Sequence, residues 1–218
     1  MLILTLLLAC SDATKDKPMA TVSETPAKVE APAVAPPAAV PAGPQVKLPA
    51  SGTVGFTAAK VTKSHDGSFS EWTGTLTMSG LTLSGVEVTV QVASISTGEE
   101  RLDKHLKSPD FFDAPTMPTA TFVSTAVRPG APAGSPPDAT HTIEGDLAMH
   151  GVSKHVIFPA RVNVSPDAVM AHAEFGINRK DFGIVYPGKP DDLIKDEVLL
   201  KADLIANRSA PATVPAPQ

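Results

Sequence analysis

From residue 51 onward, apolar and polar residues alternate along the chain with a period of two. The clearest run is residues 86–92, in which four valines lie on one face and three polar residues on the other. This alternation is typical of a β-strand with one buried face and one solvated face. Eight such segments are expected, at residues 52–60, 69–78, 86–92, 120–127, 142–149, 155–164, 169–177 and 195–205.

Turn-forming residues separate most of these segments, and one stretch has helical periodicity. Residues 98–108 place Leu102 and Leu106 four positions apart, which predicts a short amphipathic helix that caps one open end. The whole pattern predicts an all-β fold, an antiparallel barrel or sandwich, over residues 51–206. Turns are expected at residues 65–67, 79–80, 84–85, 150–151 and 165–167, and a Pro/Gly-rich loop at 129–138.

The inward faces of the expected strands mix large and small residues. An eight-stranded barrel is just wide enough to be filled by side chains or to hold one small ligand. Small inward residues leave room, but the alternation does not say whether that room is filled. The large and small neighbours are Phe56 with Ala58, Trp72 with Gly74, Phe158 with Ala160, and Phe175 with Ala173.

The two ends of the chain lack the alternation seen in residues 51–206. Residues 1–9 are almost wholly apolar. They are far shorter than the ~20 residues that span a bilayer, so a signal peptide is expected. Residues 10–50 are rich in Pro and Ala and should form a disordered, extended tether. At about 3 Å per residue, this tether could reach up to ~100 Å. A disordered tail is expected at 207–218.

Composition excludes several classes of function. The net charge is −5 with no basic cluster, so no nucleic-acid partner is expected. The single cysteine cannot form an internal disulfide. The six histidines lack the spacing of metal ligands, so neither a metal site nor a cofactor is predicted. Catalytic motifs such as G-x-S-x-G, a P-loop or H-E-x-x-H are absent, which argues against an enzyme.

Several ordered motifs resemble the YceI-like lipid/polyisoprenoid-binding family across residues 51–206. The resemblance implies a lipocalin-like, eight-stranded antiparallel barrel whose long interior holds an isoprenoid or similar lipid chain, in a protein exported to the periplasm. Some members carry Arg directly before the Asp of the central motif, where this chain has Leu102. The matching motifs are SIST at 94–97, LDKHLKS at 102–108, DFFD at 110–113, PTATF at 118–122, GDL at 145–147, HGVSK at 150–154, FGINRKDFG at 175–183 and KDEV at 195–198.

Residues 7–10 (LLAC) resemble a bacterial lipobox, in which the cysteine becomes the acylated first residue of the mature protein. Lipidation at Cys10 would anchor the protein to a membrane at the periplasmic face of the cell envelope. Ser11, in place of Asp, favours the outer membrane by likeness to enteric lipoproteins. The alternatives are an ordinary signal with an incidental cysteine and a start codon placed too far downstream. A homodimer is compatible with the sequence.

The candidate ligand-binding residues fall into two groups. Inward aromatics of the strands would line the interior, with plain core packing as the alternative. Aromatics and a histidine of the cap segment would lie at the mouth, with docking of the helix as the alternative. The strand candidates are Phe56, Trp72, Phe122, Phe158 and Phe175, and the cap candidates are His105, Phe111 and Phe112.

Three polar residues, Asp103, His105 and Arg179, decide between the functional hypotheses. They could contact a ligand head group, but structural hydrogen bonds and ion pairs are the favoured interpretation. The main hypothesis is therefore non-catalytic binding, transport or sequestration of a long apolar lipid of isoprenoid or quinone type. The alternatives are a cell-envelope interaction module with a filled barrel and an enzyme acting on a lipid-like substrate.

Overall fold

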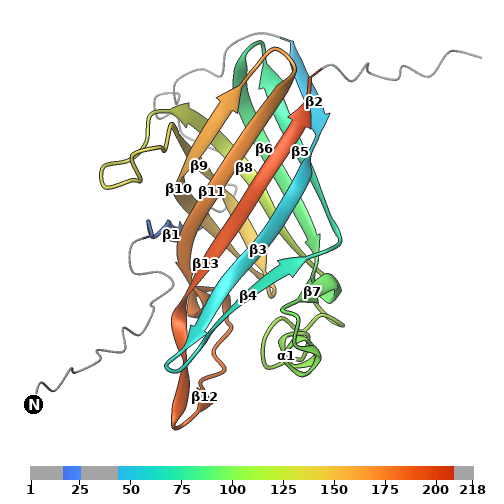
Figure 1. The fold of residues 1–218 in the computed structure, drawn as a ribbon, viewed down its shortest axis with the longest axis vertical. Helices are drawn as coiled ribbons and strands as arrows, with labels where there is room; N and C mark the ends of the chain where they lie inside the picture. Colours follow the sequence, from blue (N-terminus) through green and yellow to red (C-terminus); the bar gives the residue numbers. More distant parts are fainter. Residues whose placement is uncertain (1–16, 26–43, 209–218) are drawn as a thin grey trace, which may run out of the picture.

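The computed structural model describes residues 17–25 and 44–208. These residues form one curled antiparallel sheet with a short helix, α1 (Glu100–Leu106), near one end (Figure 1). Two 3₁₀ turns, η1 (Val92–Ser94) and η2 (Arg179–Phe182), flank the strands. The strands are β1 (Thr21–Glu24), β2 (Gln45–Pro49), β3 (Ser51–Lys60), β4 (Ser64–Phe69), β5 (Trp72–Ser79), β6 (Thr82–Gln91), β7 (Ile95–Ser96), β8 (Thr119–Pro129), β9 (His141–Met149), β10 (Val152–Val164), β11 (Ala168–Asn178), β12 (Gly188–Lys189) and β13 (Asp192–Asn207).

All eight expected strands are present, as β3, β5, β6, β8, β9, β10, β11 and β13. The all-β class is therefore confirmed. The strand count is not, because the described residues also form β1, β2, β4, β7 and β12. The hydrogen-bonded order is β2-β5-β6-β8-β9-β10-β11-β13-β3-β4-β7. Five of the ten neighbouring pairs are consecutive strands, and the numbering of β6-β8 and β11-β13 is interrupted only by the two-residue strands β7 and β12. This is close to the pattern of an up-and-down barrel.

The sheet curls back on itself where the chain passes from β2 to β3. β2 pairs with β5, whereas β3 pairs with β13 on one edge and with β4 on the other. The change of partner occurs around Ala50, whose N–H bonds to the Gly74 carbonyl at 2.9 Å. Gly52 follows with φ +126°, and a Cβ there would lie 2.0 Å from the Asp203 carbonyl oxygen. Only glycine permits this close approach between β3 and β13.

Two of the expected turns are instead parts of strands. Residues 65–67 lie inside β4, and the chain reverses just before them, at residues 61–63. Asp66 and Gly67 suggested a turn, but in β4 the Asp66 carboxylate accepts a hydrogen bond from Thr57 across the pair. Residues 84–85 lie in β6 at a β-bulge, where the register with β5 shifts near Met78. Turns do occur at 79–82, 150–151 and 165–167.

The expectation of a continuous disordered tether at 10–50 is wrong for the residues that the structure describes. Thr21–Glu24 pair with β10, and Gln45–Pro49 pair with β5. Prolines obscured both segments, although a strand at a sheet edge tolerates them. The predicted signal peptide and lipidation site, Cys10 included, lie outside the described residues, as does nearly all of the predicted tail. Within residues 17–25 and 44–208, no helix is long and apolar enough to cross a membrane.

One end of the barrel is packed solid. Its interior is filled by large aliphatic side chains, each at most 5% exposed. Paired positions bring them together, as with Leu48 and Leu76, and Met78 and Leu83. Arg208 ties this end together by donating to the carbonyls of Ser165 and Gly80. We call it the solid end and define it by Leu48, Leu76, Met78, Leu83 and Val169.

Candidate ligand-binding cavity

Beyond the solid end, towards α1 and η2, the barrel interior contains a cavity of about 190 Å³. Side chains from β3, β4, β6, β8, β9, β10, β11 and β13 wall it. Thr121, Arg179 and Lys201 are the only polar residues among those that line it in the described chain. An apolar cavity of ~150 Å³ in another protein stays dry and binds benzene, so this space suits an apolar group better than water.

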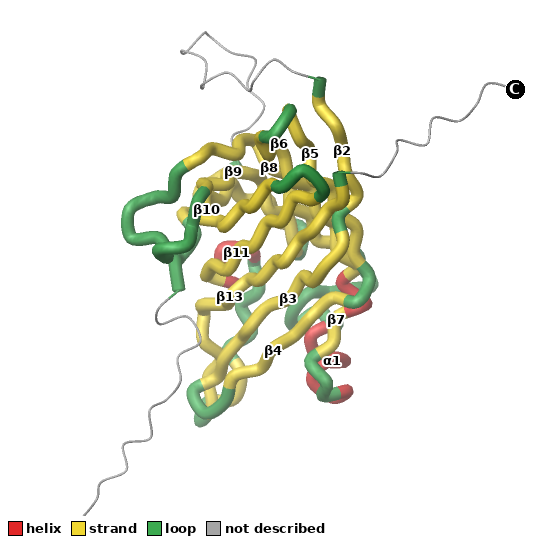
Figure 2. Tube along the Cα trace, turned by 45° about the horizontal axis from the view of Figure 1, so that its top comes forward, coloured by secondary structure: helices red, strands yellow, loops and turns green. Residues whose placement is uncertain are grey.

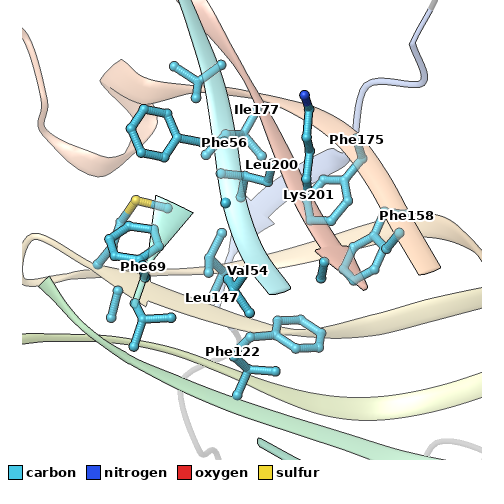
Figure 3. Close-up of a pocket in the computed structure, with 18 of the residues that line it drawn as sticks. Val54, Phe56, Phe69, Phe122, Leu147, Phe158, Phe175, Ile177, Leu200 and Lys201 are labelled. Atoms are coloured by element: carbon cyan, nitrogen blue, oxygen red, sulfur yellow. The ribbon is translucent and has the colours of Figure 1, made fainter. Parts of the chain in front are cut away.

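Phenylalanine rings surround the cavity. Figure 3 shows Phe56, Phe69, Phe122, Phe158 and Phe175 around the same space. Phe158 and Phe175 stack with their ring centroids 3.9 Å apart and nearly parallel planes, and Phe122 lies 5.4 Å from Phe158. The rings present flat apolar walls, which suit an apolar ligand with few polar features.

Glycines on neighbouring strands hold two of these rings in place. Gly67 is the cross-strand partner of Phe56, and a Cβ on Gly67 would lie 2.3 Å from the Phe56 ring. A Cβ on Gly145 would likewise lie 2.6 Å from the Phe122 ring. Any larger residue at either glycine would push the ring towards the cavity. Both glycines therefore keep the space open.

Small residues account for the space itself. Ala160 and Ala173 lie on β10 and β11 next to the stacked phenylalanines and line the cavity. Ala58 and Ala202 continue this wall on β3 and β13, where Ala202 is the cross-strand partner of Ala173. The expected alternation of large with small inward residues is therefore seen around the cavity, and here it leaves a void rather than a filled core.

The cap segment contributes apolar side chains to the cavity and keeps its polar ones outside. Leu106, Phe111 and Phe112 line the cavity. Asp103 accepts hydrogen bonds of 2.7 Å from both the backbone N–H and the hydroxyl of Thr97, which hold the start of α1 against β7.

His105 pairs with Asp110 at 3.1 Å and packs edge-on against the rings of Phe111 and Tyr186. It does not line the cavity. Asp103 and His105 thus form hydrogen bonds around α1 and its following turn, and neither lines the cavity.

Arg179 is the one fully buried charge among the cavity-lining residues, with 4% of its surface exposed. Burial lowers the pKa of its guanidinium, and the Asp196 carboxylate opposes that shift. The guanidinium donates to the carbonyls of Lys195, Ile184 and Ile194 and to Asp196. The three acceptors on β13, Ile194, Lys195 and Asp196, tie η2 to that strand, so Arg179 acts as a structural link there. Its partner is Asp196 rather than Asp103.

Six of the eight candidate residues line the cavity: Phe56, Phe111, Phe112, Phe122, Phe158 and Phe175. Trp72 and His105 do not. Trp72 lies on the inward face of β5 as expected, but its ring packs over Gly74, where a Cβ would lie 2.8 Å from the indole. Phe69 lines the cavity and was missed, because it was expected to begin the strand 69–78, on the face opposite Trp72, whereas it ends the separate strand β4.

The described residues do not bring the three polar candidates together, and they contain no metal-binding group. Asp103, His105 and Arg179 each bond to a different partner, as given above. No group of three His, Cys, Asp or Glu residues among residues 17–25 and 44–208 is placed to hold a metal ion. The chemistry available in the cavity is therefore burial of apolar surface.

Comparisons with known proteins agree on the relatives of this chain. The YceI-like domain matches residues 47–206. A UPF0312 protein of Pseudomonas savastanoi is 34% identical over 130 residues, which are 56% of this chain and 65% of the relative. A UPF0312 protein of Pseudomonas fluorescens is 33% identical over 143 residues, 62% of this chain and 71% of the relative. The chain thus matches somewhat less than two thirds of the first of these relatives.

Solved structures share the fold. BcnA of Burkholderia cenocepacia has a TM-score of 0.57 and 25% identity, covering 70% of this chain and 96% of that protein. A domain of Saccharophagus degradans, described as a polyisoprenoid binding domain, has a TM-score of 0.55 and covers 71% of this chain and 92% of its own. At 14% identity, this second likeness shows the fold alone.

Proposed function

Because the chain belongs to the YceI-like domain family, we propose that it binds the apolar chain of an isoprenoid-type lipid in the cavity and catalyses no reaction. One observation carries the proposal: a cavity of about 190 Å³ in the barrel interior is walled almost wholly by phenylalanine rings, alanines and aliphatic side chains. Ordinary cores contain few voids larger than a water molecule. The polyisoprenoid-binding description of the Saccharophagus domain supports the same ligand class.

Burial of apolar surface is enough to give useful affinity. Each CH₂ group that leaves water contributes about 0.8 kcal/mol, so one five-carbon isoprene unit offers several kcal/mol before the costs of binding. The ligand needs no polar head group inside, because the buried Arg179 already donates to four protein acceptors. Affinity should therefore follow the length and shape of the apolar chain.

We further propose that the protein acts at the periplasmic face of the cell envelope, anchored through an acylated Cys10, with the outer membrane as the favoured location. The apolar residues 1–9 followed by Cys10 support this placement. A lipid carrier that is anchored to a membrane is well placed to exchange lipids with that membrane. Labelling cells with a radioactive fatty acid should mark the wild-type chain and leave a Cys10→Ser chain unmarked.

The binding proposal is tested by native mass spectrometry with farnesol and geranylgeraniol, on a full-length chain carrying Cys10→Ser. We expect one alcohol per chain. Ala173→Phe adds a ring that fills the cavity and should abolish this adduct. Met170→Phe, on the exposed face of the same strand, is the matched control and should retain it. A folded Ala173→Phe chain with an unchanged lipid adduct would refute binding in this cavity.

The alternative of an interaction module is weakened by the void, because that hypothesis rests on a filled barrel. The enzyme alternative is weakened by the separation of Asp103, His105 and Arg179 into three unrelated contacts. A His105→Ala chain should keep lipid binding and lose only a little stability. Loss of turnover of any candidate substrate in this variant would revive the enzyme hypothesis.

A further inference from the structure

The barrel wall is split between β10 and β11. These strands are hydrogen-bonded to each other only where Arg161–Val164 meet Val169–His172. Continuing that register would pair Phe158 with Phe175 and Ile157 with Gly176, but neither pair forms a ladder. The stacked rings of Phe158 and Phe175 lie where the two strands begin to separate. We call the unpaired stretch the β10–β11 opening.

The N-terminal segment, residues 17–25, fills this opening. Its β1 pairs antiparallel with β10, from Thr21 opposite Ile157 to Glu24 opposite Lys154. Just before β1, Met19 forms a parallel bridge with Gly176 of β11. The segment therefore joins the wall as an inserted strand, and Figure 1 shows β1 beside β10 and β11.

Glycine at position 176 makes room for this insertion. Gly176 donates to the Pro18 carbonyl and accepts from the Ala20 N–H, both at 2.8 Å. A Cβ there would lie 2.2 Å from the Met19 sulfur. The side chains of the segment alternate, with Ala20 and Val22 packed on the core and Met19 and Thr21 exposed. The segment thus fits the opening specifically.

The attachment is weak compared with that of the other wall strands. Ala20 and Val22 are only partly buried. Its ion pairs, Lys17 with Glu174 and Glu24 with Lys154, each include a well-exposed partner. Exposed ion pairs of this kind contribute little. Local opening of such a segment costs much less than global unfolding.

The cavity lies directly behind the opening. Phe158 and Ala160 on β10, and Ala173, Phe175 and Ile177 on β11, line it. Residues on both sides of the split therefore form the cavity wall, and displacement of one short strand would expose that wall to solvent.

We propose that the β10–β11 opening is the lateral portal through which the lipid chain enters the cavity, and that residues 17–25 are the displaceable strand that closes it. This rests on the proposed lipid binding. Lys17 is the seventh residue after Cys10. Seven residues reach at most roughly 25 Å, so an acylated Cys10 would hold the portal close to the membrane surface.

A disulfide that fixes the segment in place tests the proposal. Thr21 and Ile157 are cross-strand partners on the outer surface. Partners of this kind lie about 4.5–5.5 Å apart at Cα, within the range that a disulfide spans. In a full-length Cys10→Ser background, Thr21→Cys with Ile157→Cys gives the locked chain. Thr73→Cys with Thr89→Cys, between β5 and β6 away from the opening, gives the matched control.

Retinol, a fluorescent isoprenoid alcohol, serves as the probe in stopped-flow mixing. We expect oxidation of the locked chain to slow both uptake and release by roughly tenfold or more, and reduction to restore them. The control should exchange at the same rate in both states. Entry past α1 at the end of the barrel would leave the rates of the oxidised locked chain unchanged, and that result would overturn the portal.

A loosening variant gives the opposite test. Val22→Asp places a charge at a partly buried position of the segment and should speed exchange several-fold, whereas Ser23→Asp, at an exposed position, should not. Unchanged exchange in Val22→Asp would overturn the portal even if the locked chain failed to fold. If no form takes up retinol, the binding proposal itself fails. If all forms take it up at one rate, binding stands and lateral entry does not.

Discussion

The solid end and the cavity are parts of one barrel that use the same alternation of inward and outward residues for opposite results. At the solid end, inward positions carry Leu, Met and Val, and the space is filled. Around the cavity, Phe rings and Ala residues stand among the Val, Leu and Ile side chains of the wall, and about 190 Å³ remains open. Alternation therefore decides that a barrel forms, and the sizes of the inward residues decide whether it is hollow.

Rings and alanines are a stable way to keep a void. Uniform aliphatic side chains interdigitate and close the interior, as Met78 and Leu83 do. Rigid phenylalanine rings cannot fold over the alanines beside them, and Gly67 and Gly145 remove the atoms that would push Phe56 and Phe122 inward. A void costs stability, so its retention points to an occupant.

The largest expected loss of stability is at the solid end. Leu76→Ala removes a side chain with no exposed surface and should lower the free energy of unfolding by about 2–5 kcal/mol. Leu147→Ala, in the cavity wall, should cost less because its neighbours already border a void. Urea denaturation measures both, with Leu81→Ala as the exposed control. Equal costs at the two leucines would mean that the cavity is packed as tightly as the solid end.

Two alanines on β13 test the same difference in packing, with a smaller expected effect on stability. Ala206 is 2% exposed and belongs to the core that the cavity does not reach, whereas Ala202 lines the cavity. Ala206→Leu should overpack and destabilise the protein by about 1–3 kcal/mol. Ala202→Leu should be nearly neutral or stabilising but should weaken retinol binding. Thermal melts with and without retinol separate these effects, and a destabilised Ala202→Leu chain would contradict an open cavity at that position.

Sequence reasoning found the strands because period-two alternation is a local property. Four of the six cavity-lining candidates follow from the same pattern, because they occupy inward positions of their strands. The other two, Phe111 and Phe112, were expected from the cap segment instead. It failed where the outcome depends on distant partners. The β4 sequence SHDGSF has the composition of a turn, and only Phe56 and Thr57 on β3 make it a strand. Trp72 faces inward as expected, but its place around the barrel depends on β2 and Gly74, which no local pattern encodes.

The smallest expected effect is a change in the stability of the barrel with pH that leaves binding in the cavity unchanged. Burial lowers the pKa of His141 below its ordinary value of 6.5, so the folded state favours the neutral ring. As the pH falls below about 6.5, the unfolded chain binds a proton that the folded chain does not, and stability is lost until the folded pKa is passed. His141 does not line the cavity. We therefore expect the Tm to fall between pH 7.5 and 5.5, less so in His141→Gln, while the affinity for retinol stays constant. If the affinity of the wild-type chain fell together with the Tm, protonation of the barrel wall would be coupled to ligand binding. The cavity would then not be independent of the packing around it.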